Sequence, residues 1–120
     1  MNKIYYLKTC DTCQRILKQL PLQNFELQDI KSNPITVMQL DSMQQLAGSY
    51  EALFSRRAKK YHQMGLKNQS LTEQDYRRLL LDEYTFLKRP VVLLGTEIFV
   101  GSSKKNVQNL LDAVQKTRTK

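Results

Sequence analysis

The stretch YYLKTCDTCQR, residues 5–15, decides the fold because it joins a strand pattern to a helix pattern through two cysteines. Residues 4–7 are a short run of β-prone side chains and predict a first strand. The residues around Cys10 are of types that cap helices, and the apolar positions after them keep helical spacing as far as Pro21, which ends the helix. The pattern therefore places Cys10 at a strand–helix junction, with Cys13 one helical turn later.

The middle of the chain has the apolar spacing of helices. Apolar side chains at intervals of three and four predict helices over residues 36–46 and 50–61, the second ending with Gly65 as its C-cap. The sequence Ser70-x-x-Glu73 resembles a capping box and predicts the start of a further helix.

The two ends of the chain supply the strands. Residues 25–30 alternate apolar and polar side chains and predict a second strand. Residues 91–94 and 97–100 flank a two-residue turn that begins with glycine, which is typical of a hairpin. A last helix comes next, capped by Ser102 or Ser103.

The resulting order is βαβ, a helical block over about 36–85, and ββα. Strands that alternate with helices indicate an α/β protein with a sheet covered by helices, and the terminal hairpin makes that sheet mixed. This is the order of a thioredoxin-like fold with a helical insertion. We expect residues 1–120 to form one such domain, since 120 residues suffice for a single core.

Composition and charge restrict the class of protein further. Apolar residues make up 41% and charged residues 25% of the chain, as in ordinary globular domains. No apolar run is long enough to span a membrane, and the N-terminus lacks a signal-peptide pattern, so we expect a cytoplasmic protein with no membrane partner. The net charge of +8 favours anionic partners, although solubility alone accounts for such a charge equally well.

Cys10 and Cys13 are the only cysteines, and their Cys-x-x-Cys spacing favours redox chemistry. Free N–H groups at a helix N-terminus stabilise a thiolate, so Cys10 is the expected nucleophile and Cys13 the resolving thiol. Asp11 between them opposes a low pKa. A zinc site would need about four ligands, and His62 is the only histidine. A structural disulfide is uncommon in the cytoplasm, whereas two unrelated buried cysteines remain an alternative.

Four segments together resemble the arsenate reductase (ArsC)/Spx family of thioredoxin-fold proteins. Their order and spacing, rather than the Cys-x-x-Cys motif alone, carry the resemblance, which spans nearly the whole chain. The segments are YYLKTCDTCQR at 5–15, EALFSRRAKKYHQMGL at 51–66, FLKRPVVL at 86–93 and GTEIFVG at 95–101.

The resemblance implies a site around the cysteines. Pro90 would be a cis proline beside them, and Arg89 would bind an oxyanion or stabilise the Cys10 thiolate. The family's earlier arginine falls at Arg57 or Arg56, and we also assign Thr12 to the binding site. No metal or bound cofactor is expected. The implied activity is a thiol oxidoreductase, and specifically reduction of arsenate through a Cys10 thiolate that is resolved by Cys13 or by glutathione and glutaredoxin, with thioredoxin as another electron donor.

Two departures from the family pattern favour an alternative. Arsenate-reducing members carry a third arginine late in the second hairpin strand, where residues 97–100 offer none, and Lys104 or Lys105 supplies charge without the arginine fork. Glutaredoxin-dependent members also use one cysteine in the N-terminal motif, and this chain has two. The alternative is a Spx-like regulator that binds RNA polymerase and senses oxidants through a Cys10–Cys13 disulfide. In either case a monomer is expected.

Overall fold

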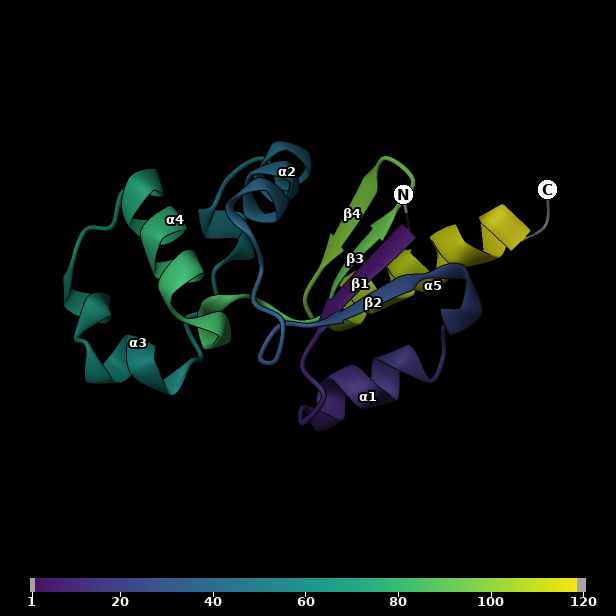
Figure 1. Ribbon diagram of the computed structural model, residues 1–120, viewed down its shortest axis with the longest axis horizontal. Coiled ribbons are helices and arrows are strands. Elements are labelled where there is room, and N and C mark those ends of the chain that lie inside the picture. The colour runs from purple at the N-terminus through teal and green to yellow at the C-terminus, as the bar shows by residue number, and fades with distance from the viewer. Residues whose placement is uncertain (1, 119–120) are drawn as a thin grey trace. The chain divides into compact units, whose positions relative to one another are not determined.

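The computed structural model describes residues 2–118, with side chains described as far as Thr117. The chain forms two compact units (Figure 1). The first combines Met1–Asn33 with Arg89–Lys120, and the second is the intervening segment Pro34–Lys88. Across the described residues, no helix has both the length and the apolar character needed to cross a membrane.

The first unit contains a four-stranded mixed sheet, which confirms the predicted α/β class. Its strands are β1 (Asn2–Tyr6), β2 (Glu26–Asp29), β3 (Val91–Leu94) and β4 (Glu97–Val100), in the spatial order β2-β1-β3-β4. The central strand β1 pairs parallel with β2 and antiparallel with β3, and the predicted hairpin joins β3 to β4. The parallel pair requires a crossover, which α1 (Asp11–Leu17) supplies.

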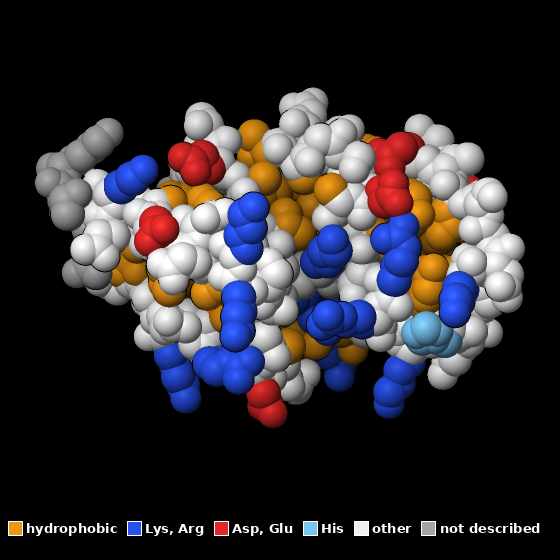
Figure 2. Space-filling view, turned by 180° about the vertical axis from the view of Figure 1, so that it is seen from behind, with side chains coloured by type: hydrophobic (Ala, Val, Ile, Leu, Met, Phe, Trp, Pro, Cys, Tyr) orange, Lys and Arg blue, Asp and Glu red, His pale blue; other side chains and the backbone are white. Residues whose placement is uncertain are grey.

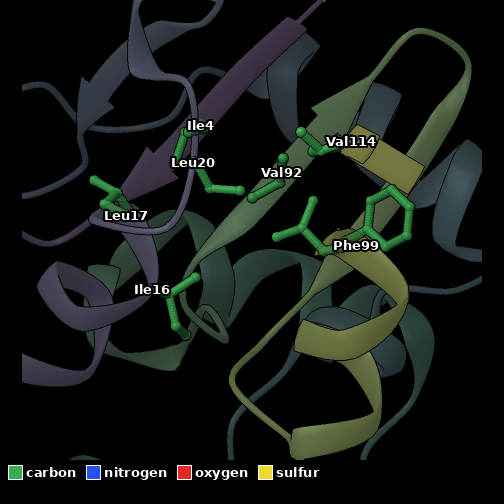
Figure 3. Close-up of a cluster of buried hydrophobic side chains, with 8 residues drawn as sticks. Ile4, Ile16, Leu17, Leu20, Val92, Phe99 and Val114 are labelled. Atoms are coloured by element: carbon green, nitrogen blue, oxygen red, sulfur yellow. The ribbon is translucent and has the colours of Figure 1, made fainter. Parts of the chain in front are cut away.

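The core of this unit lies between one face of the sheet and two helices, α1 and α5 (Lys104–Arg118). Side chains at alternate strand positions share a face, so one face of the sheet meets the apolar stripes of both helices. Figure 3 shows this cluster, in which each helix contributes side chains against the strands. Its buried members are Ile4, Ile16, Leu17, Leu20, Val92, Phe99, Leu110 and Val114.

Ser103, one of the two predicted caps, begins α5. Its Oγ accepts a hydrogen bond from the backbone N–H of Asn106 at 3.2 Å. The Asn106 side chain donates in turn to the carbonyl oxygen of Gly101 at 2.8 Å, and the N–H of Gly101 donates to the carbonyl oxygen of Pro90, also at 2.8 Å. The first turn of α5 is therefore tied through hydrogen bonds to the segment that precedes β3.

The second unit is built from helices and short turns. Its α-helices are α2 (Val37–Ala47), α3 (Lys59–Gln63) and α4 (Glu73–Asp82). Three 3₁₀ turns accompany them: η2 (Glu51–Leu53), η3 (Leu66–Asn68) and η4 (Tyr84–Phe86).

The predicted helix that starts at residue 50 is present only in its last part, as α3 (Lys59–Gln63), which Gly65 follows in a left-handed conformation as predicted; its first part is not an α-helix. The chain leaves η2 at Phe54 in an extended conformation, and Phe54 forms an isolated antiparallel bridge with Leu87. Two backbone hydrogen bonds flank the bridge, from Ser55 to Phe86 at 2.7 Å and from Lys88 to Leu53 at 2.8 Å. Helical spacing in this segment therefore reflects apolar side chains directed into the core from an irregular backbone, which periodicity alone cannot distinguish from a helix.

The predicted capping box at Ser70 and Glu73 is also wrong, because the helix begins two residues later. Thr72 is the N-cap of α4, and its hydroxyl accepts from the Asp75 N–H at 3.2 Å while the Asp75 carboxylate accepts from the Thr72 N–H at 2.9 Å. Both pairs have the spacing of a capping box, and the reciprocal hydrogen bonds form in the Thr72 pair.

Candidate active site

Cys10 is the N-cap residue of α1, directly after the loop that leaves β1. Its backbone is extended, with φ −91° and ψ 113°, and its N–H donates to the carbonyl oxygen of Leu7 at 3.0 Å. Its own carbonyl oxygen accepts the first helical hydrogen bond, from the N–H of Gln14 at 3.0 Å. The Cys10 side chain is partly exposed, so a reactant can reach it.

Cys13 lies in the first turn of α1, 3.6 Å from Cys10. Its side chain is 0% exposed. Neither cysteine is in a disulfide in this structure. The two cysteines therefore differ in accessibility: Cys10 is partly exposed and Cys13 is buried, so a reactant from solvent meets Cys10 first.

The surroundings of Cys10 favour its thiolate. Partial burial raises the pKa of Cys10. Four interactions lower it, and together they outweigh the effect of burial: those with the backbone N–H and the thiol of Cys13, with the positive charge of Arg89 and with the backbone N–H of Thr12. The pKa of Cys10 is therefore below the ordinary thiol value. A thiolate is the nucleophilic form of cysteine, so the lowered pKa increases the share of Cys10 in its nucleophilic form.

The surroundings of Cys13 have the opposite effect. Burial is the main cause that raises the pKa of Cys13 to about 11; the Leu7 backbone lowers it, the neighbouring Cys10 raises it again, and the charge of Arg89 lowers it slightly. Cys13 thus holds its proton more tightly than Cys10 does. Because part of the shift comes from Cys10, any reaction that neutralises the Cys10 sulfur brings the pKa of Cys13 down.

Arg89 and Pro90 enter the site from a distant part of the chain, just before β3. The Arg89–Pro90 peptide bond is cis, as the family resemblance implies. Arg89 is partly buried, with its Nε shielded from solvent, and its charge acts on both cysteines. The register of β1 against β3, in which Tyr5 pairs with Val91, brings these two segments together.

Two side chains that the sequence did not single out hold the loop before Cys10. The Gln14 side chain donates to the carbonyl oxygen of Lys8 at 2.9 Å, and the Lys8 N–H donates to Oδ1 of Asp29 at 3.1 Å. Asp29 ends β2, and Gln14 comes directly after the cysteine motif in α1. No short motif marks such contacts, because they depend on the path of the loop.

The remaining predicted site residues lie in different units. Thr12 is in α1 beside the cysteines, where its backbone contributes to the Cys10 environment. Arg56 belongs to the second unit, where it donates to Glu51 at 2.7 Å and to the Tyr76 hydroxyl at 3.0 Å. Arg57, also in that unit, is exposed, and among the described residues it has no ion pair.

Within residues 2–118, no group of three or more His, Cys, Asp or Glu side chains is placed to hold a metal ion.

Replacing Arg89 with glutamine is expected to raise the pKa of Cys10. The guanidinium charge favours the Cys10 thiolate, so its removal shifts the pH profile of alkylation by iodoacetamide to higher pH and slows alkylation several-fold at neutral pH. The matched control is Arg15→Gln, since Arg15 is an exposed arginine of α1 that does not contribute to the Cys10 pKa. Equal profiles for Arg89→Gln and wild type would contradict the role of Arg89.

Comparison with known proteins identifies the relatives of this chain. The model of the ArsC family matches residues 5–110. Three solved structures are similar over most of both chains. An arsenate reductase from Vibrio cholerae is 16% identical with a TM-score of 0.75, covering 92% of this chain and 95% of that chain. An arsenate reductase (ArsC) related protein from Brucella melitensis is 21% identical with a TM-score of 0.66, covering 90% and 92%. A Staphylococcus aureus protein is 27% identical with a TM-score of 0.71, covering 91% and 97%. No curated protein matches the chain significantly.

Proposed function

The chain belongs to the ArsC family, and from this premise we propose that it is a thiol–disulfide oxidoreductase in which Cys10 is the nucleophile and Cys13 the resolving thiol. One observation carries the proposal: a partly exposed thiol of lowered pKa lies 3.6 Å from a buried thiol of raised pKa. The alternative of two unrelated buried cysteines does not fit, because Cys10 is partly exposed. We assign the cycle to the cytoplasm, where thiols are kept reduced.

We propose arsenate as the substrate for which the family membership argues most directly. The Cys10 thiolate attacks arsenic(V), a sulfur–arsenic bond forms, and an arsenate oxygen leaves as water after protonation. A second thiolate then attacks the Cys10 sulfur, so that a disulfide forms and the electron pair of the sulfur–arsenic bond stays on arsenic, which departs as arsenite. The two thiols are oxidised and arsenic is reduced by two electrons.

The second thiol is Cys13 in this proposal, with glutathione as the other candidate. Forming the arsenic adduct removes the negative charge of Cys10, which lowers the pKa of Cys13 at the moment when Cys13 is needed. A dithiol donor such as thioredoxin or glutaredoxin then reduces the Cys10–Cys13 disulfide. The positive charge of Arg89 beside the cysteines suits both the oxyanion and the thiolate. A contact of Arg57 or Arg56 with the oxyanion stays a prediction from the resemblance.

The experiment that tests this function is arsenite production by reduced protein, with glutathione plus glutaredoxin and with thioredoxin as separate donors. The expected result is turnover with at least one donor that disappears in Cys10→Ser. If arsenite never exceeds the level of the Cys10→Ser control, arsenate is not the substrate. Reversible formation of the Cys10–Cys13 disulfide, monitored in the same samples, would still support the thiol–disulfide chemistry.

A Spx-like regulator is the second candidate, and two observations favour it. The two cysteines are close enough to join in a disulfide that serves as an oxidant sensor, and β4 (Glu97–Val100) carries no arginine for an oxyanion. In this role the protein would bind RNA polymerase in only one redox state. Co-purification of polymerase with either the oxidised or the reduced protein alone would support it. Equal binding, or none, in both states would exclude it.

A further inference from the structure

Three exposed lysines lie at the end of the first unit's sheet that carries Cys10. The register pairs Tyr5 with Val91 and Val91 with Val100, so the chain leaves β1, enters β3 and leaves β4 at one end of the sheet. Cys10 lies at this end, in the segment after β1. The three lysines lie at the same end: Lys8 is between β1 and Cys10, and Lys104 and Lys105 come after β4. We call these three side chains the lysine rim.

The lysine rim shares not only an end but also a face of the sheet with Cys10. Helices α1 and α5 both contribute to the core on one face, and both begin at the end where Cys10 lies (Figures 1 and 3). The hydrogen bonds from Asn106 to Gly101 and from Gly101 to Pro90 fix the first turn of α5 beside the cis proline. Lys104 and Lys105 are the first two residues of that turn.

The placement of Lys104 and Lys105 is electrostatically unfavourable for α5 itself. The N-terminus of a helix carries a partial positive charge and favours acidic side chains. Helix α4 obeys this rule with Glu73 and Asp75, whereas the first turn of α5 contains no acidic residue and two lysines. The electrostatics of the helix N-terminus therefore do not account for these two lysines.

The lysine rim belongs to a strongly basic unit and is not neutralised within it. The first unit holds 11 of the 19 Lys and Arg residues but only 5 of the 11 Asp and Glu residues, a net charge of +6 out of +8. Figure 2 shows basic side chains outnumbering acidic ones on one face of the molecule. Among the ion pairs of the described residues, none involves Lys8, Lys104 or Lys105.

We propose that the lysine rim is the docking surface for a dithiol protein whose reactive thiol is surrounded by acidic side chains. This inference rests on the proposed thiol–disulfide function and names the kind of electron donor it would use. Arg89 already supplies a charge that acts on the cysteines themselves. The rim lysines come from two segments outside the cysteine motif, on long exposed side chains, where charge acts on an approaching surface more than on one reacting atom.

The exchange after docking balances in two steps. A thiolate of the donor attacks the Cys10 sulfur of the Cys10–Cys13 disulfide, so that a mixed disulfide forms and Cys13 leaves as a thiolate and takes up a proton. The second donor thiol, after losing its proton, attacks the donor sulfur of the mixed disulfide and releases the Cys10 thiolate. The donor dithiol becomes a disulfide, and two electrons pass to this protein.

The test uses oxidised protein and two synthetic dithiol peptides that contain Cys-x-x-Cys, one flanked by glutamates and the other by lysines. We expect the acidic peptide to reduce the Cys10–Cys13 disulfide faster at low salt, by a factor on the order of five, and the preference to vanish toward 1 M salt. Dithiothreitol, which is neutral, reports the reactivity of the disulfide itself. If dithiothreitol reveals no reversible disulfide, the proposed function fails; if it does and the peptides react equally, only the docking surface fails.

Two double variants with the same net charge locate the effect. Lys104→Gln with Lys105→Gln removes two rim charges, and Lys18→Gln with Lys116→Gln removes two exposed charges from the other ends of α1 and α5. Lys116 is roughly 18 Å along α5 from Lys104. The rim variant should lose about half or more of the preference for the acidic peptide, and the control should keep it. Equal losses in the two variants would show that net charge, and not the lysine rim, attracts the donor.

Discussion

Serine in place of Cys10 is expected to abolish the reaction with oxidised glutathione, slowing thiol–disulfide exchange on the order of 10³-fold or more. The physical reason is the difference between the two thiols. Cys10 is partly exposed and has a lowered pKa, whereas Cys13 is 0% exposed and has a pKa of about 11. Cys13 therefore cannot replace Cys10 as the attacking group, and a serine hydroxyl remains protonated at any accessible pH.

Serine in place of Cys13 should have the opposite signature. Cys10 still attacks, but the mixed disulfide with glutathione finds no neighbouring thiol to resolve it and accumulates. Intact mass spectrometry distinguishes the outcomes: wild type loses two hydrogens as its own disulfide forms, Cys13→Ser gains one glutathione, and Cys10→Ser stays unchanged. Modification of Cys10→Ser at the wild-type rate would contradict the assignment of roles.

The pair of variants tests the chemistry that the enzyme and the regulator share, and the choice between the two needs a different measurement. Both proposals need Cys10 as the first thiol to be oxidised and a disulfide with Cys13 as the product. The two proposals differ in the lifetime of that disulfide, because an enzyme must return to the reduced state with each turnover, while a sensor must remain oxidised long enough to change its partner. Wild-type protein that forms the disulfide reversibly but produces no arsenite would therefore favour the regulator, and arsenite production that depends on Cys10 would favour the enzyme.

The fold was predictable from local patterns because most of its strands and helices are bounded by strong signals. The hairpin of β3 and β4 and helix α2 begin and end within a residue of the predicted bounds. The start of α4 was predicted less well, because both Ser70 and Thr72 are followed three residues later by an acidic residue. The capping box is at Thr72 and not at Ser70. The two pairs have the same spacing, so the local pattern does not decide between them.

The positions of the two cysteines in the candidate site could be predicted from the sequence, but the effect of their surroundings on each pKa could not. The Cys10–Cys13 spacing is local, and the cis bond at Pro90 was implied by the family resemblance. The opposite pKa shifts of the two thiols depend on burial and on the charge of Arg89, which is 76 positions from Cys13 in the sequence. A local sequence pattern cannot predict that Arg89 lies near the cysteines, because the pairing of β1 with β3 brings them together.

The segment around Phe54 is a second place where a local sequence pattern does not predict the backbone structure. Its apolar spacing predicts a helix, but Phe54 is the centre of an aromatic cluster and its backbone bridges to Leu87. The Phe54 ring stacks on Phe86 with centroids 4.8 Å apart and meets Tyr76 edge-on at 4.9 Å and Tyr61 at 6.1 Å. Tyr76 and Phe86 are distant from Phe54 in the sequence, so tertiary packing outweighs local helix propensity here.

Alanine in place of Phe54 is accordingly expected to lower the free energy of unfolding by about 3–5 kcal/mol. The side chain is 0% exposed, and its removal leaves a cavity and ends three aromatic contacts in the second unit. Since a domain of this size has a stability of roughly 5–15 kcal/mol, the loss is a large share of the total. Urea unfolding monitored by circular dichroism measures the change.

Leu46→Ala is the matched control for Phe54→Ala, because it also truncates an apolar side chain of the second unit, but one that is 44% exposed on α2. We expect Leu46→Ala to change the free energy of unfolding by about 0.5 kcal/mol or less, since an exposed side chain leaves no cavity and alanine favours the helix. A comparable loss in both variants would mean that Phe54 is not the packing centre of the unit. A large loss in Phe54→Ala alone would place the stability of this unit in its aromatic cluster and not in its helices.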